Sequence, residues 1–298
     1  MKAIMKPVAK TEKSVSCLGL LLLILSFSVH AQSPVWKIEK NNKVIFIGGS
    51  FHMLTPEDYP LPAAFEEAYQ QSAQIVFETD IQKAQSPEYQ QTMIRQLSYN
   101  DGRNLQQVLK EDTYLAVAEF FTNRGIPMAA IVNFKPGMVA MTMTVVELQR
   151  LGLVGVGVDA YYNEKSINDQ KKLGQLESVE DQLEFISRMG EGREDEMLSY
   201  TITDIEAIPG MWKQMKDAWR NGDMSKLRDI GISPLKSDFP ALYQSIIVDR
   251  NNSWMPQIEA ILKTREVEFV LVGALHLAGD DGLLAQLASR GYKIQQLP

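Results

Sequence analysis

Two apolar segments at opposite ends of the chain close with the same phrase: a glycine, two further residues and a histidine. The first runs from Val44 to His52 and the second from Phe269 to His276, more than 200 positions later. Each reads as a strand followed by a turn. In an α/β fold, residues just past the carboxyl ends of parallel strands build the binding pocket. If the two histidines share a pocket, both ends of the chain must enter one sheet.

The repetition of this phrase points to function. Glycine supplies 19 of the 298 residues, so a given histidine has glycine three positions before it about one time in sixteen. Both histidines would do so by chance roughly once in 250. Histidine is also the side chain whose protonation and metal affinity are poised near neutral pH. His52 and His276 are therefore the leading candidates, and a packed or capping histidine in each place is the simpler alternative.

The first 31 residues have the pattern of an export signal. Four lysines precede an apolar stretch of about ten residues, Leu18 to Phe27, and Val29-His30-Ala31 predicts signal cleavage after Ala31. This stretch is too short to span a bilayer stably, and no later segment approaches 18 apolar residues. We expect a periplasmic or secreted protein with no stable membrane span after cleavage. An uncleaved N-terminal anchor is the alternative.

Cleavage would change the charge and the cysteine content of the chain. It removes four lysines and one glutamate, which takes the formal charge from −7 to −10, and it removes Cys17, the one cysteine. The exported chain then has no cysteine for a disulfide, a thiol nucleophile or a thiolate ligand. Its acidity argues against nucleic acid as the main partner. A peptide or small-molecule substrate bound in a cleft is the expectation that remains.

The residues after the signal, 32–298, begin and end with strand patterns. Residues 36–47 read as a hairpin, 62–72 as a helix and 74–79 as a strand. This order describes a β–α–β unit, so strands 44–49 and 74–79 are predicted to be parallel neighbours. Near the C-terminus the pattern resumes with a strand over 267–272, a helix over 281–289 and a strand over 291–294.

The central region is mostly helical by its apolar spacing. The predicted helices are 86–99, 104–110, 112–124, 136–151, 178–190, 193–205, 208–220 and 223–229, and the run 152–159 is either a strand or a loop. We therefore predict an α/β fold whose mixed central sheet is built from both ends of the chain, residues 32–84 and 245–298. A large, mostly helical insertion, residues 85–244, separates these two parts.

A third polar residue joins the two histidines at the predicted edge of the sheet. Glu78 lies near the end of strand 74–79. Two histidines and one carboxylate form an open ligand set for a divalent ion, which would acidify a bound water or polarise a carbonyl. Without a metal, one histidine would act as general base on water while Glu78 holds the imidazole. Gly49 and Gly273 would let the backbone turn sharply and bring a ligand near the main chain.

Further candidates lie outside the strands. Arg250 follows a helical stretch that leads back to the sheet, where it would clamp a carboxylate or a developing oxyanion. Asp159 follows a glycine-rich run and is a possible further acid or ligand. An ordinary helix-end base and an ordinary surface carboxylate are the simpler alternatives. The chain has no Gly-x-Ser-x-Gly, phosphate loop or His-Glu-x-x-His motif.

These residues resemble the motifs of the TraB/PrgY/GumN family. The family belongs with the Tiki metalloproteases and, more distantly, with erythromycin esterase-like and ChaN-like proteins. The resemblance runs from about Val35 to the C-terminus. It is carried by Gly49-Ser50-Phe51-His52, Val76-Phe77-Glu78-Thr79 and Gly273-Ala274-Leu275-His276, with lesser signatures in Gly157-Val158-Asp159, Leu176-Glu177 with Gln182, and Asp249-Arg250-Asn251. One departure is Gly137, which stands where an aromatic residue is common in the family.

The resemblance implies a Tiki/ChaN/erythromycin esterase-like fold, with His52, Glu78 and His276 as the active site. Tiki members look like proteases that depend on ions such as manganese or cobalt. The leading hypothesis is an exported divalent-metal-dependent hydrolase, a peptidase, in which these three residues hold one ion of the manganese, cobalt or zinc type. Arg250 would stabilise negative charge, and Gly49, Gly273, Asp159 and Asn251 would line the binding site.

Two other functions remain open at this point. One is a non-catalytic periplasmic protein that binds a ligand or haem in the same pocket. The other is a metal-free esterase with a histidine base, as the esterase relatives suggest.

Overall fold

The computed structural model describes residues 32–298, so the predicted export signal lies outside the described residues. Its sheet has six strands in the order β4-β3-β5-β2-β1-β6. Strands β2, β5, β3 and β4 run parallel, whereas β1 is antiparallel to both β2 and β6. The strand bounds are β1 Val35–Lys40, β2 Lys43–Ser50, β3 Gln74–Phe77, β4 Lys172–Gln175, β5 Glu268–Gly273 and β6 Lys293–Gln296.

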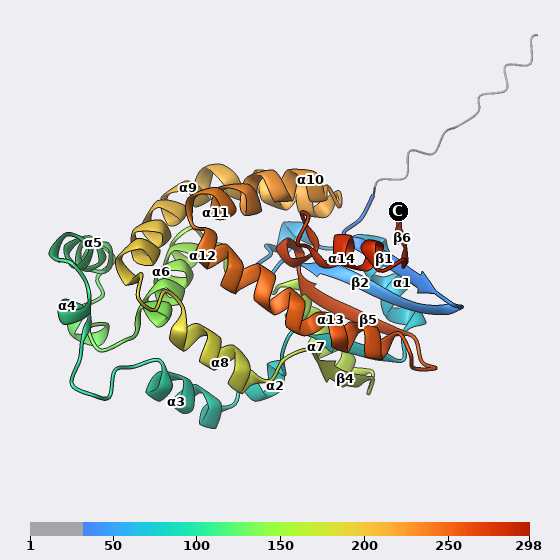
Figure 1. The fold of residues 1–298 in the computed structure, drawn as a ribbon, viewed down its shortest axis with the longest axis horizontal. Helices are drawn as coiled ribbons and strands as arrows, with labels where there is room; N and C mark the ends of the chain where they lie inside the picture. Colours follow the sequence, from blue (N-terminus) through green and yellow to red (C-terminus); the bar gives the residue numbers. More distant parts are fainter. Residues whose placement is uncertain (1–31) are drawn as a thin grey trace, which may run out of the picture. The chain divides into compact units, whose positions relative to one another are not determined.

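The predicted fold class is confirmed: a mixed sheet takes strands from both ends of the chain, with most helices between them (Figure 1). The α-helices are α1 Ala63–Gln71, α2 Ile81–Ala84, α3 Pro87–Gln96, α4 Leu105–Val108, α5 Glu111–Thr122, α6 Pro136–Arg150, α7 Val158–Asn168, α8 Val179–Arg188, α9 Glu194–Arg220, α10 Met224–Leu227, α11 Ser233–Asp238, α12 Pro240–Tyr243, α13 Arg250–Ile261 and α14 Leu283–Ser289. Turns of 3₁₀-helix cover Pro56–Asp58, Met128–Ala130 and Ala274–Leu277, and turns of π-helix cover Arg228–Ile232 and Gln244–Asp249. Within residues 32–298, no helix combines the length and apolar character needed to cross a bilayer.

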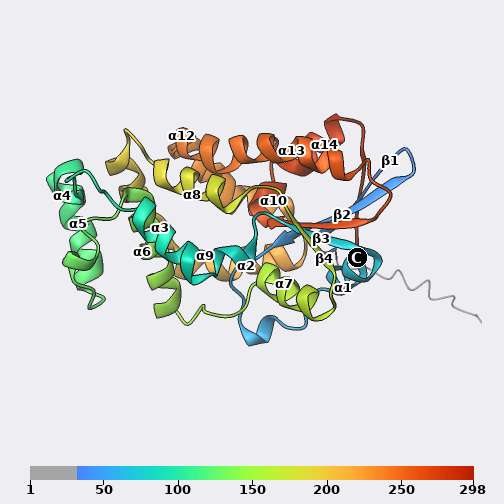
Figure 2. The same cartoon turned by 90° about the horizontal axis from the view of Figure 1, so that it is seen from below.

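The sheet is covered by helices on both faces because its buried strands alternate their side chains between two cores. In β5, Phe269 and Leu271 pack into one core, while Val270 and Val272 pack into the other. The first core includes α1, α7 and the end of α9, and the second includes α13 and α14. Figure 2 shows these two helix layers on opposite sides of the strands. The inserted helices α4, α5, α6 and the first half of α9 form a separate core of their own.

The predicted pairing of the first two parallel strands is wrong. Strands β2 and β3 do not touch, because β5 lies between them and pairs with both. The physical reason is burial: every residue of β5 is buried, and a strand that is apolar on both faces is stable only inside the sheet. The last long strand of the sequence is therefore central in the sheet.

Helix α7, strand β4 and the short helix α11 of the central region were not predicted. Helix α7 buries Asn163 and Ser166 along with its apolar residues, so its buried face lacks the usual apolar periodicity. Strand β4 is a mostly exposed edge strand with one aliphatic residue, Leu173. In the run 152–159, residues 152–157 form a loop and Val158 begins α7. The two helices predicted over 193–205 and 208–220 are one helix, α9, that continues through Pro209.

Candidate active site

The four parallel strands each deliver one polar side chain to the same edge of the sheet. Glu177 follows β4, Glu78 directly follows β3, His276 lies in the 3₁₀ turn after β5, and His52 follows β2. The strand order places them along the edge in the sequence Glu177, Glu78, His276 and His52. The structure therefore brings the three predicted residues together at the carboxyl edge, where α/β proteins place their sites, and adds Glu177 beside them.

Gly273 lies where three of these side chains converge. A Cβ atom at this position would lie 3.2 Å from Glu78 Oε1, 3.4 Å from His52 Nε2 and 3.5 Å from His276 Cδ2. The Gly273 backbone, with φ −52° and ψ 134°, is open to any residue, so the glycine is required for space and not for the sharp turn that we expected. Gly49 has a similar role: its Cβ would lie 3.1 Å from that of Ala274, in the turn that carries His276.

His52 is held by Asp159, which begins helix α7. The His52 Nδ1 lies 3.2 Å from Asp159 Oδ1, and Ser50 donates a 2.7 Å hydrogen bond to the same oxygen. The side chain is 60% exposed. Partial desolvation lowers the pKa of His52, but the hydrogen bond and charge of Asp159 and the charge of Glu78 outweigh it and raise the pKa to about 9.

His276 is buried, and one neighbouring amide fixes its tautomer. Asn251 Nδ2 donates to the carbonyl oxygens of His276, at 3.1 Å, and of Asp281, at 3.0 Å. Asn251 Oδ1 therefore faces His276 Nδ1 at 2.7 Å and accepts the proton that this nitrogen carries. Burial lowers the pKa of His276 to about 3, helped by the charges of Arg250 and His52. The ring is thus neutral near pH 7, with a lone pair on Nε2.

Arg250 bridges the other side of the site. Its Nη2 donates to Glu78 Oε2 and to Glu177 Oε1, each at 2.7 Å, and its Nη1 lies 3.1 Å from His276 Nε2. Burial raises the pKa of Glu78, but the charges of Arg250 and the two histidines and the Gly273 N–H bond hold it well below its usual range. Glu78 is therefore a carboxylate at neutral pH. Arg250, which we expected to clamp a carboxylate or an oxyanion, thus contacts Glu78 and Glu177 of the protein itself.

Each residue that the sequence singled out lies in or beside this cluster, including Asp159 and Asn251. The sequence reasoning missed the contacts of Glu177, Ser50 and Trp254. Glu177 accepts from the Trp254 indole at 2.9 Å, and the Trp254 ring lies 4.5 Å from the His276 ring. The only sequence signal for Glu177 is the family signature Leu176-Glu177, because β4, the strand that precedes it, is short and polar.

No group of three or more His, Cys, Asp or Glu side chains in residues 32–298 has metal-holding geometry. The guanidinium of Arg250 holds His276 Nε2 and one oxygen of Glu78.

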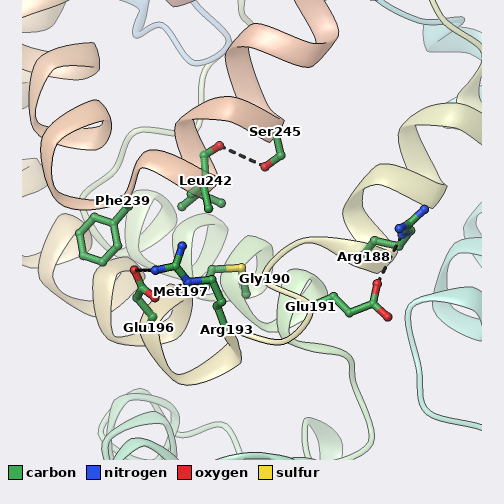
Figure 3. Close-up of a pocket in the computed structure, with 10 residues that line it drawn as sticks. Arg188, Gly190, Glu191, Arg193, Glu196, Met197, Phe239, Leu242 and Ser245 are labelled. Atoms are coloured by element: carbon green, nitrogen blue, oxygen red, sulfur yellow. Dashed lines mark hydrogen bonds and ion pairs between the residues drawn. The ribbon is translucent and has the colours of Figure 1, made fainter.

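One cavity of the described region lies away from this cluster. It measures about 180 Å³ and lies where α8, the start of α9 and α12 meet, with Met197, Phe239 and Leu242 in its wall (Figure 3). Its charged side chains pair with one another, Arg188 with Glu191 and Arg193 with Glu196. A more open cavity of about 650 Å³ lies beside α3 and α8. Neither cavity contains a residue of the cluster.

Comparisons with known proteins agree with the sequence motifs. The model of the TraB/PrgY/gumN family matches residues 34–296. The uncharacterized protein YbaP of Escherichia coli (strain K12) is 24% identical over 247 residues, which cover 81% of this chain and 87% of the relative. YbaP of Shigella flexneri is 24% identical over 240 residues, 79% of this chain and 84% of the relative. No solved structure shows a significant match.

Proposed function

The chain belongs to the TraB/PrgY/gumN family, and on that premise we propose that it is an exported, divalent-metal-dependent hydrolase that cleaves peptides. Its active site would be the cluster of His52, Glu78 and His276. The observation that carries this proposal is the convergence of the three side chains on the space that Gly273 leaves open. Three such groups at the carboxyl edge of parallel strands form a site that is built by the fold.

By their chemical types, two imidazoles and one carboxylate are donors that a divalent ion of the manganese, cobalt or zinc type accepts, although the three side chains do not have metal-holding geometry as they stand. Metal-bound histidines usually donate their second ring N–H to a carboxylate or carbonyl oxygen. Here His52 Nδ1 faces Asp159 and His276 Nδ1 faces Asn251, so each ring directs Nε2 toward the site. The charge balance also fits, because Glu78 and Glu177 pair with Arg250 while a third carboxylate, that of Asp159, lies against His52. His52 Nε2, His276 Nε2 and Glu78 would hold the ion.

A bound divalent ion would supply acidification of a water molecule and polarisation of the scissile carbonyl. The chain's own residues do the positioning. Asp159 fixes the tautomer of His52, Asn251 fixes that of His276, and the Gly273 N–H holds Glu78 Oε1 at 2.6 Å. Arg250 places a permanent positive charge beside Glu78, where it would stabilise negative charge that develops on a substrate oxygen.

A metal-free version of the same hydrolase is the second candidate, and one specific observation favours it. Arg250 already neutralises Glu78 and donates to His276 Nε2, as a cation in the site would. The carboxylate of Asp159 then orients the imidazole of His52, as an acidic partner orients the histidine of a general base. In this version the neutral form of His52, which predominates only above its pKa of about 9, takes a proton from water, and Arg250 stabilises the developing oxyanion.

Metal analysis and mutation test the proposal. The protein, purified without a histidine tag, should bind close to one Mn²⁺, Co²⁺ or Zn²⁺ per chain and cleave an unstructured protein such as casein. His52→Ala, His276→Ala and Glu78→Gln should abolish both properties, whereas Glu180→Gln, which changes an exposed carboxylate, should preserve them. Cleavage that continues in the presence of a strong chelator and is lost in His52→Ala would select the metal-free version. Cleavage that persists in both His52→Ala and Glu78→Gln would refute the site.

Export is part of the proposal and has a separate test. The predicted cleavage point after Ala31 would give a mature chain that begins at Gln32. N-terminal sequencing of the protein recovered from cell fractions should read Gln32 first, from a periplasmic or secreted fraction. A chain that retains Met1 in the membrane fraction would indicate the uncleaved anchor.

A further inference from the structure

Arg250 makes two sets of contacts that lead in different directions. Toward the site, it donates to His276 Nε2 at 3.1 Å and to Glu78 Oε2 at 2.7 Å. Away from the site, its Nε and Nη2 donate to the two oxygens of Glu177, at 3.3 Å and 2.7 Å. The second set is the two-point geometry in which a guanidinium and a carboxylate bind most strongly.

The contacts toward the site occupy atoms that a metal ion would need. The proton of His276 lies on Nδ1, so Nε2 carries the only free lone pair of the ring. Arg250 points an N–H at that lone pair. It also holds one of the two oxygens of Glu78, and the other accepts from Gly273. His52 Nε2 is the one donor of the three that Arg250 does not touch.

Glu177 can remain paired with Arg250 whether or not Arg250 contacts Glu78 and His276. Its side chain is 10% exposed, and it accepts further hydrogen bonds from Trp254, at 2.9 Å, and Gln182, at 3.4 Å. The Trp254 ring also lies under the guanidinium, 4.5 Å from its central carbon, in a cation–π contact. Arg250 can therefore leave His276 and Glu78 while its charge stays paired.

We propose that Arg250 is a displaceable cation that occupies the metal site, and that Glu177 is the residue that receives it when a divalent ion binds. This inference rests on the proposed metal-dependent function. In the ion-free protein, Arg250 satisfies Glu78 and His276. When an ion binds His52, Glu78 and His276, Arg250 retains its two-point pair with Glu177. Arg250 and Glu177 thus set the affinity of the ion without being its ligands.

The experiment measures Zn²⁺ and Co²⁺ affinity by competition with a fluorescent chelator, in protein purified without a histidine tag. Arg250→Met should bind the ions roughly 10- to 100-fold more tightly than the unmodified protein, and Glu177→Gln should bind them more weakly by a similar factor, the range typical of residues around a metal site. Arg193→Met and Glu196→Gln are matched controls, because they change an exposed ion pair near α9. Both controls should leave the affinity unchanged.

A double variant separates displacement from simple charge effects. Arg250→Met with Glu177→Gln removes one positive and one negative charge, so the net charge is unchanged. It should still bind more tightly than the unmodified protein, because His276 Nε2 and Glu78 are free. Arg250→Lys keeps the charge but lacks the planar fork, and it should also bind more tightly. This variant also serves as the test if Arg250→Met fails to fold.

Histidine ¹⁵N NMR provides a direct structural readout. After removal of residues 1–31, His52 and His276 are the two histidines of the chain. Zn²⁺ should shift the Nε2 signals of both and leave the Nδ1 proton of His276 in place. Equal affinity in the unmodified protein, the Arg250 variants and the double variant would overturn the displacement while leaving the metal-dependent function intact. No binding by any of these proteins would overturn both.

Discussion

At the scale of single residues, Gly273 has the most demanding position in the site. Its missing side chain leaves the space between Glu78, His52 and His276 open, and its N–H holds Glu78. A methyl group there would stand 3.2 Å from Glu78 Oε1 and 3.4 Å from His52 Nε2. Packed protein interiors relax little around an added carbon, so the donors would move apart.

Gly273→Ala should therefore weaken ion binding roughly 10- to 100-fold, the range seen when residues around a metal site are altered. Affinity is measured by chelator competition, and unfolding in urea reports stability. Gly210→Ala is the control, because a Cβ on this helical glycine meets no atom within 4 Å. Unchanged affinity in Gly273→Ala would show that the open space has no part in the site.

Asp159 should control the protonation of His52 in the ion-free protein. The pKa of His52 is raised from 6.5 to about 9, so the folded state binds an extra proton between these values. The stabilisation is therefore complete below about pH 6.5 and is lost as the pH rises through about 9. In Asp159→Asn this pH dependence should largely disappear, and the His52 titration followed by NMR should move down toward its ordinary value.

Ser50→Ala is the control for this experiment, because it removes a hydrogen bond to Asp159 without removing the charge. His276 should show no titration between pH 5 and 9 in either variant, since its pKa is lowered to about 3. A His52 titration that is the same in Asp159→Asn and in the unmodified protein would rule out the ion pair as the cause.

At the scale of secondary-structure elements, strand β5 carries a buried charge that the fold tolerates at a cost. Glu268 is 2% exposed, accepts a 2.6 Å hydrogen bond from Thr264 and leaves its second oxygen without a partner among the described residues. Burial raises its pKa. The folded state thus binds more protons than the unfolded state above pH 4.5, and the stability falls as the pH rises through the raised pKa.

Glu268→Gln should be more stable than the unmodified protein at pH 8 and about equally stable at pH 4. The free energy of unfolding in urea, measured at both values, checks this. Glu266→Gln is the matched control, because Glu266 is an exposed neighbour paired with Lys172. A variant that is less stable at pH 8 would show that the buried carboxylate is compensated by contacts we have not identified.

Helix α6 depends on Gly137 for its packing against α8. A Cβ on Gly137 would overlap the backbone carbonyl of Ile186 in α8, so the glycine permits the two helices to pack closely. Gly137→Ala should destabilise the protein by about 1–3 kcal/mol, as overpacking of a core typically does. Urea unfolding measures this, with Gly210→Ala again as the control. A stabilised variant would mean that α6 and α8 can separate without loss.

The sequence predicts the elements that are apolar and regular, and it fails where polar residues are buried or strands are short. Strand β5 follows from its continuous apolar run, and the hairpin of β1 and β2 from the alternation of β1 and the turn after it. Helix α7 was missed because it buries Asn163, and β4 was missed because it is polar and exposed. The two histidines of the site could be named in advance because Gly-x-x-His repeats, and Glu78 because it lies near the end of a predicted strand. The place of Glu177 could not, since it depends on the edge strand β4.

At the scale of the whole described region, the two ends of the sequence are joined through β1 and β6. Ser33 N–H donates to the carbonyl of Leu297 at 3.1 Å, and Leu297 N–H donates to Val35 at 2.9 Å. Positions near each other in a fold can be linked when the new ends lie in an exposed loop. The loop at Glu191 and Gly192, between α8 and α9, is exposed.

A circular permutant that joins residue 298 to residue 33 by a short linker and opens between Glu191 and Gly192 should fold. It should show the circular dichroism spectrum of the parent and the same ion affinity within about threefold. This size of change is well below the loss expected when a residue around the site is altered. An unfolded permutant would mean that the connection between α8 and α9 is needed for the helical core.

The central position of β5 affects when the sheet can assemble during translation. Glu78 and Gly273 are 195 positions apart, yet they share a hydrogen bond. A chain growing on the ribosome makes β2 and β3 early but cannot pair them, because the strand that separates them is among the last to emerge. Throughout translation the nascent chain holds an incomplete set of reactive groups. The proposed cleavage of peptides would therefore have to wait until β5 has been made, when the synthesis of the chain is nearly finished.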